Sequence, residues 1–362
     1  MTEAALPVPI EGEPAAAPPP PRAYELPTAR GVVTYGLQLA YRSSAELRRA
    51  SLYIGVLTLA LLGPPLVFAV ELVARYQFAD IEAFIAHLRD PSTAARFLLL
   101  IVAAYPAIFG WLAVAIDGQL IAVTLLAARA ADRPMSLREA TTRARQVFWR
   151  MIRGSFLAGL ASALVQFIVS AVLVALLGRT DAGGVVVTVA AAIFLAPLGY
   201  LATGIVIGDV GAIEALKRSI RLARARPRIA LVVALFTLVT AAVQTFALSA
   251  GLDLFITLGA FLHVGINAGV GPFVVALLGL LAFIMAFGSL NFTIAAIVAA
   301  PQVAAFLGLT YYAGGLDRVH DLPADAPRFR WVTRPMVVLI VVVAVLSAIG
   351  LTGLPAAAVV PR

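Results

Sequence analysis

Few side chains in this sequence could do chemistry. Its 362 residues include three histidines and no cysteine. His87, His263 and His320 stand far apart in the sequence, and none of them has a second ligand at helical spacing. The pattern therefore predicts neither a metal site nor thiolate chemistry. The sequence also lacks a glycine-rich phosphate loop and a nucleophile elbow, so we expect no cofactor and no enzymatic activity.

A carboxylate within an apolar run is the sharpest remaining candidate. Asp117 lies in the run 96–128, and an acidic residue inside a membrane span is a functional hypothesis by default. The run is longer than a bilayer requires, so Asp117 could also lie near the cytoplasmic interface. Two interpretations stay open, namely a structural or interfacial role and contact with an ion or a substrate.

Two glutamines occupy matching places in an internal repeat. The segment ALVQ ends at Gln166, and AAVQ ends at Gln244, 78 positions later. Glutamines inside membrane spans usually form hydrogen bonds between helices. We therefore expect both residues to stabilise helix packing.

The elements that carry these residues are membrane spans. Hydrophobic residues make up 62% of the chain and charged residues 13%, about half the charged fraction of a typical soluble domain. This composition predicts an all-α polytopic membrane protein with about seven transmembrane helices. Runs long enough to cross a bilayer are found at about 51–74, 96–128, 152–178, 184–208, 229–250, 273–300 and 335–354.

The sequence divides into three regions. Residues 1–34 form a Pro/Ala-rich segment that we expect to be a disordered cytoplasmic tail. Residues 35–320 form a membrane module of three helix-hairpin repeats, and residues 321–362 form a linker with a C-terminal transmembrane helix. The apolar stretch 272–313 reads as one span with an extension kinked at Pro301, and a tight pair of spans is the alternative.

Basic residues predict the orientation. Most of the 27 Lys and Arg residues fall in the N-terminal segment and in the loops after the second, fourth and sixth spans. With seven spans these segments share one side, which the positive-inside rule assigns to the cytoplasm. The net charge of +8 therefore reflects topology, and we expect no nucleic-acid partner. The N-terminus is predicted inside, in a bacterial inner membrane.

Two of these basic loops contain the repeated motif Glu-Ala-x-x-Arg, which begins at Glu139 and again at Glu214. Each motif predicts a basic amphipathic helix, over 136–152 and over 211–227. Ser136 and Glu139 match a capping box, and each glutamate stands four residues before an arginine. The helices could be the cytoplasmic starts of spans, contact anionic headgroups, or dock a protein partner. The arginines expected to make such contacts are Arg143, Arg145, Arg218, Arg221 and Arg224.

Three segments resemble one membrane family. They are 131–140 (ADRPMSLREA), 213–222 (IEALKRSIRL) and the pair Tyr311–Tyr312. In these segments the chain resembles the glycerophosphoryl diester phosphodiesterase membrane-domain family and its uncharacterised relatives, over roughly residues 35–320. The resemblance implies a helical membrane module without an assigned reaction.

The chain departs from that family in two respects. Ala313, Gly314 and Gly315 follow the tyrosine pair, where the family usually has an acidic and then a basic residue. The apolar spans also leave no room in the sequence for the family's soluble phosphodiesterase barrel, so the enzyme name does not transfer.

Three classes of function follow from these observations. We expect a non-enzymatic membrane module for lipid organisation or partner docking, with membrane lipids, anionic headgroups or a protein as partners. A transporter or permease-like protein for a small or amphiphilic solute is the alternative, supported by the repeat and by Asp117. A membrane-embedded enzyme would need a set of acid, base, nucleophile or metal residues that the sequence lacks.

Overall fold

The computed structural model describes residues 28–76, 81–177, 181–268, 270–310 and 329–352. These residues are almost entirely helical and contain no strand, and seven of their helices are long and apolar enough to span a membrane. The all-α polytopic fold is thereby confirmed. Most of the expected tail, His320 and the pair Tyr311–Tyr312 lie outside the described residues.

The helices are α1 (Gly31–Arg42), α2 (Ser44–Tyr76), α3 (Ile81–Leu88), α4 (Pro91–Ala130), α5 (Leu137–Leu177), α6 (Asp181–Leu195), the short 3-10 helix η1 (Ala196–Leu198), α7 (Leu201–Val206), α8 (Ala212–Ala225), α9 (Pro227–Ala268), α10 (Val270–Thr310) and α12 (Arg334–Thr352).

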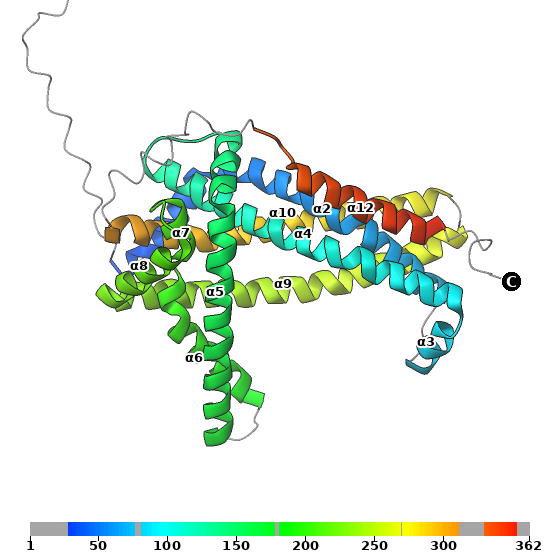
Figure 1. The fold of residues 1–362 in the computed structure, drawn as a ribbon, viewed down its shortest axis with the longest axis horizontal. Helices are drawn as coiled ribbons and strands as arrows, with labels where there is room; N and C mark the ends of the chain where they lie inside the picture. The colour runs from blue at the N-terminus through cyan, green and yellow to red at the C-terminus, as the bar shows by residue number, and fades with distance from the viewer. Residues whose placement is uncertain (1–27, 77–80, 178–180, 269, 311–328, 353–362) are drawn as a thin grey trace, which may run out of the picture.

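The centre of the molecule is a bundle in which α2, α4, α9, α10 and α12 run side by side (Figure 1). Small residues let α12 lie close to its neighbours. A Cβ on Gly110 of α4 would collide with Leu339 of α12, and a Cβ on Gly350 of α12 would collide with Phe68 of α2. Tight packing through glycine is how membrane helices associate without a hydrophobic driving force between them.

One end of this bundle, which we call the basic end, gathers arginines from several helices. Arg129 near the end of α4 forms a 2.5 Å ion pair with Glu46 at the start of α2. Tyr53 of α2 donates a 2.6 Å hydrogen bond to the carbonyl of Trp331, just before α12. Arg145 of α5 bonds to the carbonyls of Arg330 and Trp331. The starts of α2, α5 and α12 and the end of α4 therefore meet at one end.

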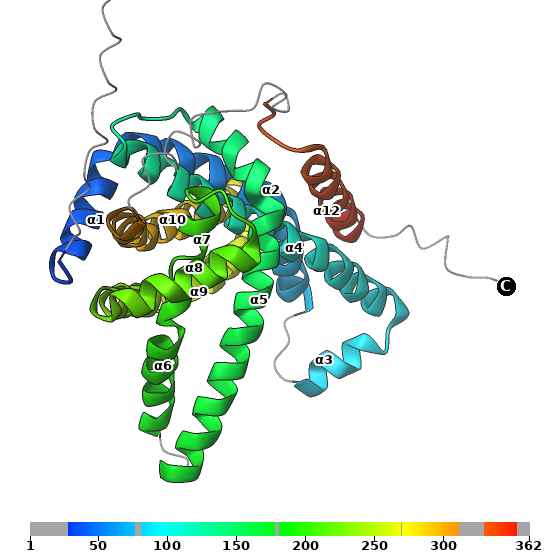
Figure 2. The ribbon, with the colours of Figure 1, turned by 60° about the vertical axis from the view of Figure 1, so that its left-hand side comes forward.

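The hairpin of α5 and α6 leaves this bundle. In two views related by a 60° turn, α5 and α6 run across the long axis of the bundle (Figures 1 and 2). None of the residues in the most apolar stretch of α5 is buried. Phe156, Leu164 and Phe167 of this stretch are exposed, so most of the packing surface of α5 belongs to its first third.

The helix continues through Pro301 and is broken at Pro197. Pro301 lies within α10, which runs unbroken from Val270 to Thr310, so the predicted single kinked span is one helix and the alternative pair of spans is wrong. The predicted span 184–208 is broken at Pro197, where η1 separates α6 from α7. Ser219 of α8 bonds to the backbone at this break, since its Oγ donates to the Pro197 carbonyl and accepts from the Tyr200 amide.

The two basic motifs fold differently. The helix expected over 136–152 is the beginning of α5, continuous with the span that follows, so of the interpretations left open the start of a span holds for this copy. The second motif does form a helix of its own, α8, which ends before Pro227 opens α9. Proline disfavours helical geometry in the residue before it, and Arg226 has left the helical region at φ −138°. The first copy has no proline at the corresponding place, so its helix continues.

Candidate functional site

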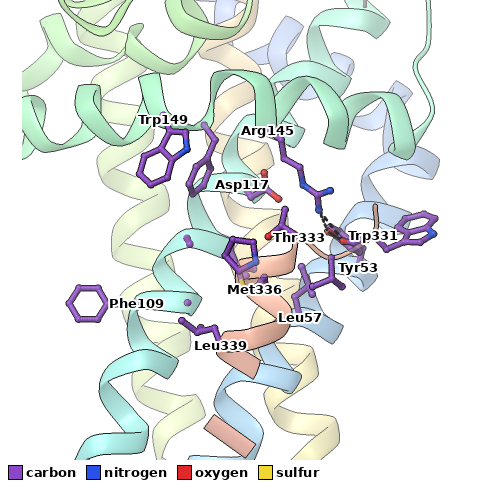
Figure 3. A pocket seen from close by; sticks show the side chains of 16 residues that line it. Tyr53, Leu57, Phe109, Asp117, Arg145, Trp149, Trp331, Thr333, Met336 and Leu339 are labelled. Atoms are coloured by element: carbon purple, nitrogen blue, oxygen red, sulfur yellow. Dashed lines mark hydrogen bonds between the residues drawn. The ribbon is translucent and has the colours of Figure 1, made fainter. Parts of the chain in front are cut away.

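A cavity of about 450 Å³ lies at the basic end of the bundle, between α2, α4, α5 and the segment that leads into α12. Asp117 and Arg145 enter it from α4 and α5, above Thr333 and Met336 (Figure 3). The polar groups therefore stand at one end of a space whose other walls are apolar. Its lining consists of Tyr53, Leu57, Phe109, Gly110, Ala113, Val114, Asp117, Arg145, Phe148, Trp149, Trp331, Val332, Thr333, Pro335, Met336 and Leu339.

The carboxylate of Asp117 has a buried oxygen that the described protein leaves unsatisfied. Its Oδ1 atom is buried and has no hydrogen-bond partner among the described residues. Arg145 is near enough to act on Asp117 electrostatically, but the two side chains form no ion pair. A buried acceptor without a donor costs free energy unless a bound molecule supplies the donor. Asp117 is thus placed to receive a hydrogen-bond donor or a cation from within the cavity.

Arg145 closes the cavity by holding the chain before α12. Its guanidinium donates to the carbonyls of Arg330 and Trp331, the latter at 3.0 Å, and to the Tyr53 hydroxyl at 3.2 Å. Its Nε atom is buried and has no partner in the described residues. Arg145 therefore keeps one buried N–H group without an acceptor in the described structure, and its side chain lines the cavity together with Asp117.

Aromatic side chains form the outer rim of the cavity. Phe109 and Trp149 both line it, and they are 66% and 69% exposed. They belong to α4 and α5, two helices that are long and apolar enough to span a membrane. The cavity is therefore bordered by exposed aromatic side chains as well as by charged groups.

Arg143 lies inside the protein, away from the expected headgroup contacts. It is 6% exposed, donates a 3.0 Å hydrogen bond to the Val206 carbonyl, and lies 3.3 Å from Asp209. Asp209 also binds Arg150 at 2.7 Å. The expected Glu139–Arg143 pair does not form, because Glu139 bonds to the Ser136 backbone amide in the predicted capping box. Arg143 fastens α5 to the loop after α7.

The three arginines of α8 lie nearer the surface. Arg218 and Arg221 both bind Glu214, at 3.1 and 2.9 Å, which includes the predicted i,i+4 pair. The hydrogen bond from Arg218 holds the pKa of Glu214 below its usual range. Arg224 is exposed at the end of the helix. Headgroup contact stays a prediction for these three residues.

The two repeated glutamines have separate environments. Gln244 of α9 donates a 2.6 Å hydrogen bond to Asn291 of α10, which is the expected contact between helices. Gln166 is exposed and has no such bond in the described structure, because α5 has left the bundle at that point. It lines a second cavity of about 650 Å³ with Gln302 of α10.

The described residues contain no group of three or more His, Cys, Asp or Glu side chains that could hold a metal ion. The chain matches no protein-family model, and no characterised protein or solved structure is significantly similar to it.

Sequence reasoning missed three residues of the basic end. Tyr53 and Trp331 carry no motif, and they reach Arg145 across 92 and 186 positions. Asp209 stands shortly before the second basic motif. An acidic residue between two arginine-rich segments could have been recognised from the sequence as an ion-pair partner for their arginines. Its φ of 47° is uncommon outside glycine, although aspartate adopts it more readily than most residues.

Proposed function

We propose that this membrane protein is a non-enzymatic module that takes an amphiphile from the bilayer into the Asp117–Arg145 cavity. One observation carries the proposal, namely an apolar cavity, bordered by exposed aromatic side chains, that ends in a carboxylate with an unpartnered oxygen. Apolar walls with a few converging polar groups are the usual form of a small-molecule site. The walls would hold acyl or other apolar chains, and the two charged residues would hold the head.

The expected setting is the inner membrane of a bacterium, with the basic end at the cytoplasmic face and the N-terminus inside. The positive-inside rule supports this orientation, since Arg129, Arg145 and Arg330 all lie at that end. Trp149 and Trp331 line the same cavity, and tryptophan favours the membrane–water interface. Kinship with the glycerophosphoryl diester phosphodiesterase membrane-domain family rests on the three short segments quoted above.

Transport of a solute is a second candidate with its own observation. The fourth span is broken at η1, and the second cavity adjoins this break through Leu195, Ala196 and Gly199. Broken helices beside polar groups are typical of transporter binding sites. Transport would predict flux of a labelled amphiphile across vesicles that contain the protein, whereas binding alone predicts retention without flux.

Occlusion of the cavity tests the first proposal. Ala113 lines it, so Ala113→Phe would fill part of its volume, while Ile108→Phe places the same ring on an exposed position of α4. Native mass spectrometry of protein extracted in mild detergent should show about one retained amphiphile on the wild type and on Ile108→Phe. We expect that amphiphile to be lost from Ala113→Phe. Equal retention by all three proteins would refute the proposal.

A further inference from the structure

Two side chains of opposite charge, Asp117 and Arg145, line one cavity without forming an ion pair. The Asp117 carboxylate has an oxygen without a donor, and Arg145 has an Nε–H group without an acceptor in the described structure. The two side chains form no ion pair, yet Arg145 acts electrostatically on Asp117. A gap of this kind fits a molecule that brings both a donor and an acceptor.

We propose that the amphiphile bound there has a zwitterionic head, with a primary ammonium at Asp117 and an anionic phosphate oxygen at the Arg145 guanidinium. This inference rests on the amphiphile-binding function proposed above and names its ligand class. A head with only negative charge would bring no cation to Asp117, and its phosphate would be repelled by the carboxylate even where head-group hydroxyls could donate to it. A head with only positive charge would leave the Arg145 donor unpaired.

The hydrogen-bonding capacity of the ammonium decides between zwitterions. A primary ammonium has three N–H donors, as in lysine, and can satisfy the Asp117 oxygen directly. A quaternary ammonium has none, and its recognition usually relies on a cage of aromatic rings. Phosphoethanolamine heads therefore fit this site better than phosphocholine heads.

Thr333 and Tyr53 add polar atoms beside the two charges. Both residues line the cavity, and Tyr53 is fixed there by its bonds to Arg145 and to the Trp331 carbonyl. The walls beyond them are apolar, formed by Val114, Met336 and Leu339. Such walls favour a phosphoethanolamine that carries acyl chains over the free headgroup.

The test places the purified full-length protein in nanodiscs and offers it lipids of defined headgroup, supplied as vesicles. Native mass spectrometry would compare retention of phosphatidylethanolamine, phosphatidylcholine and phosphatidylglycerol, with soluble phosphoethanolamine as a competitor. We expect wild-type protein to prefer phosphatidylethanolamine by roughly tenfold, the size of one charge-assisted hydrogen bond. Asp117→Asn should remove the preference.

The matched control is Glu71→Gln, which neutralises another intramembrane carboxylate. Glu71 lies near the other end of α2 and pairs with Arg96 at 3.7 Å. This variant should keep the preference. Equal retention of the three lipids by the wild type, or an unchanged preference in Asp117→Asn, would overturn the zwitterion inference. If Asp117→Asn fails to fold, the retention of the three lipids by wild-type protein still tests the inference.

Each failure has its own signature. Retention of one amphiphile without headgroup preference refutes only the inference about the head. If wild-type protein retains no amphiphile at all, the amphiphile-binding function itself is refuted. The same conclusion follows if soluble phosphoethanolamine displaces the bound lipid as effectively as added phosphatidylethanolamine does.

Discussion

The two copies of the basic motif share a sequence but have different surroundings. In α5 the arginines turn inward, where Arg143 reaches Asp209 and Arg145 closes a cavity. In α8 the corresponding arginine, Arg218, binds Glu214 of its own helix. The difference arises because α5 continues into a span across the bundle, whereas Pro227 ends α8. A repeated motif therefore specifies a local helix, and its neighbours decide what its charges do.

The largest expected effect distinguishes the buried Arg143 from Arg218, which is only partly buried. Asp209→Asn keeps a residue type that tolerates positive φ but removes the countercharge of Arg143. Breaking a buried pair leaves an uncompensated charge, and since Asp209 is 30% exposed we expect a loss of about 2 kcal/mol. An unfolding titration with SDS in mixed micelles would measure it.

The matched change in α8 is Glu214→Gln, which removes the countercharge of Arg218 at the surface. This variant should unfold at nearly the wild-type midpoint, because both side chains of this pair are partly exposed and solvent screens their attraction. Equal losses from Asp209→Asn and Glu214→Gln would mean that the two copies do not differ in the way described.

An intermediate effect concerns anionic lipid at α8. Replacing Arg218, Arg221 and Arg224 by Gln should lower the retention of anionic lipid about tenfold. Each basic residue near an anionic leaflet contributes about 1 kcal/mol, and Glu214 offsets part of that attraction. Lipid retention by native mass spectrometry checks this expectation, and Arg143→Gln in α5 serves as the comparison. If the triple variant retains as much anionic lipid as the wild type, these arginines do not bind headgroups and serve only to set the topology.

The smallest expected effect is a pH dependence within α8. Because Arg218 lowers the pKa of folded Glu214, the pair adds stability above the unfolded pKa of about 4.5 and loses it as pH falls through the folded value. The difference in stability between wild type and Glu214→Gln should therefore stay constant from pH 7 to pH 5 and shrink only below that window. A difference that already disappears between pH 7 and pH 5 would contradict the lowered pKa.

Composition and periodicity were sufficient to predict the helices, the spans and the capping box at Ser136. Such features depend on neighbours within a few positions of the chain. The candidate site was predicted only in fragments, with Asp117 as an intramembrane acid and Arg145 as a headgroup contact. Their meeting with Tyr53 and Trp331 depends on how distant helices pack, and no local pattern encodes it. The break at Pro197 and the departure of α5 from the bundle are tertiary features of the same kind.

Photolabelling offers the most direct test of the central claim, that an amphiphile enters the Asp117–Arg145 cavity. A phosphatidylethanolamine with a photoreactive acyl chain would be crosslinked in nanodiscs, and the labelled positions would be mapped by peptide mass spectrometry. If the amphiphile enters the cavity, labelling should be concentrated on α4 near Phe109 and on α12 near Met336, and Ala113→Phe should abolish it. Labelling spread evenly over lipid-facing residues such as Phe156 and Phe167 of α5, with no excess at the cavity, would contradict it.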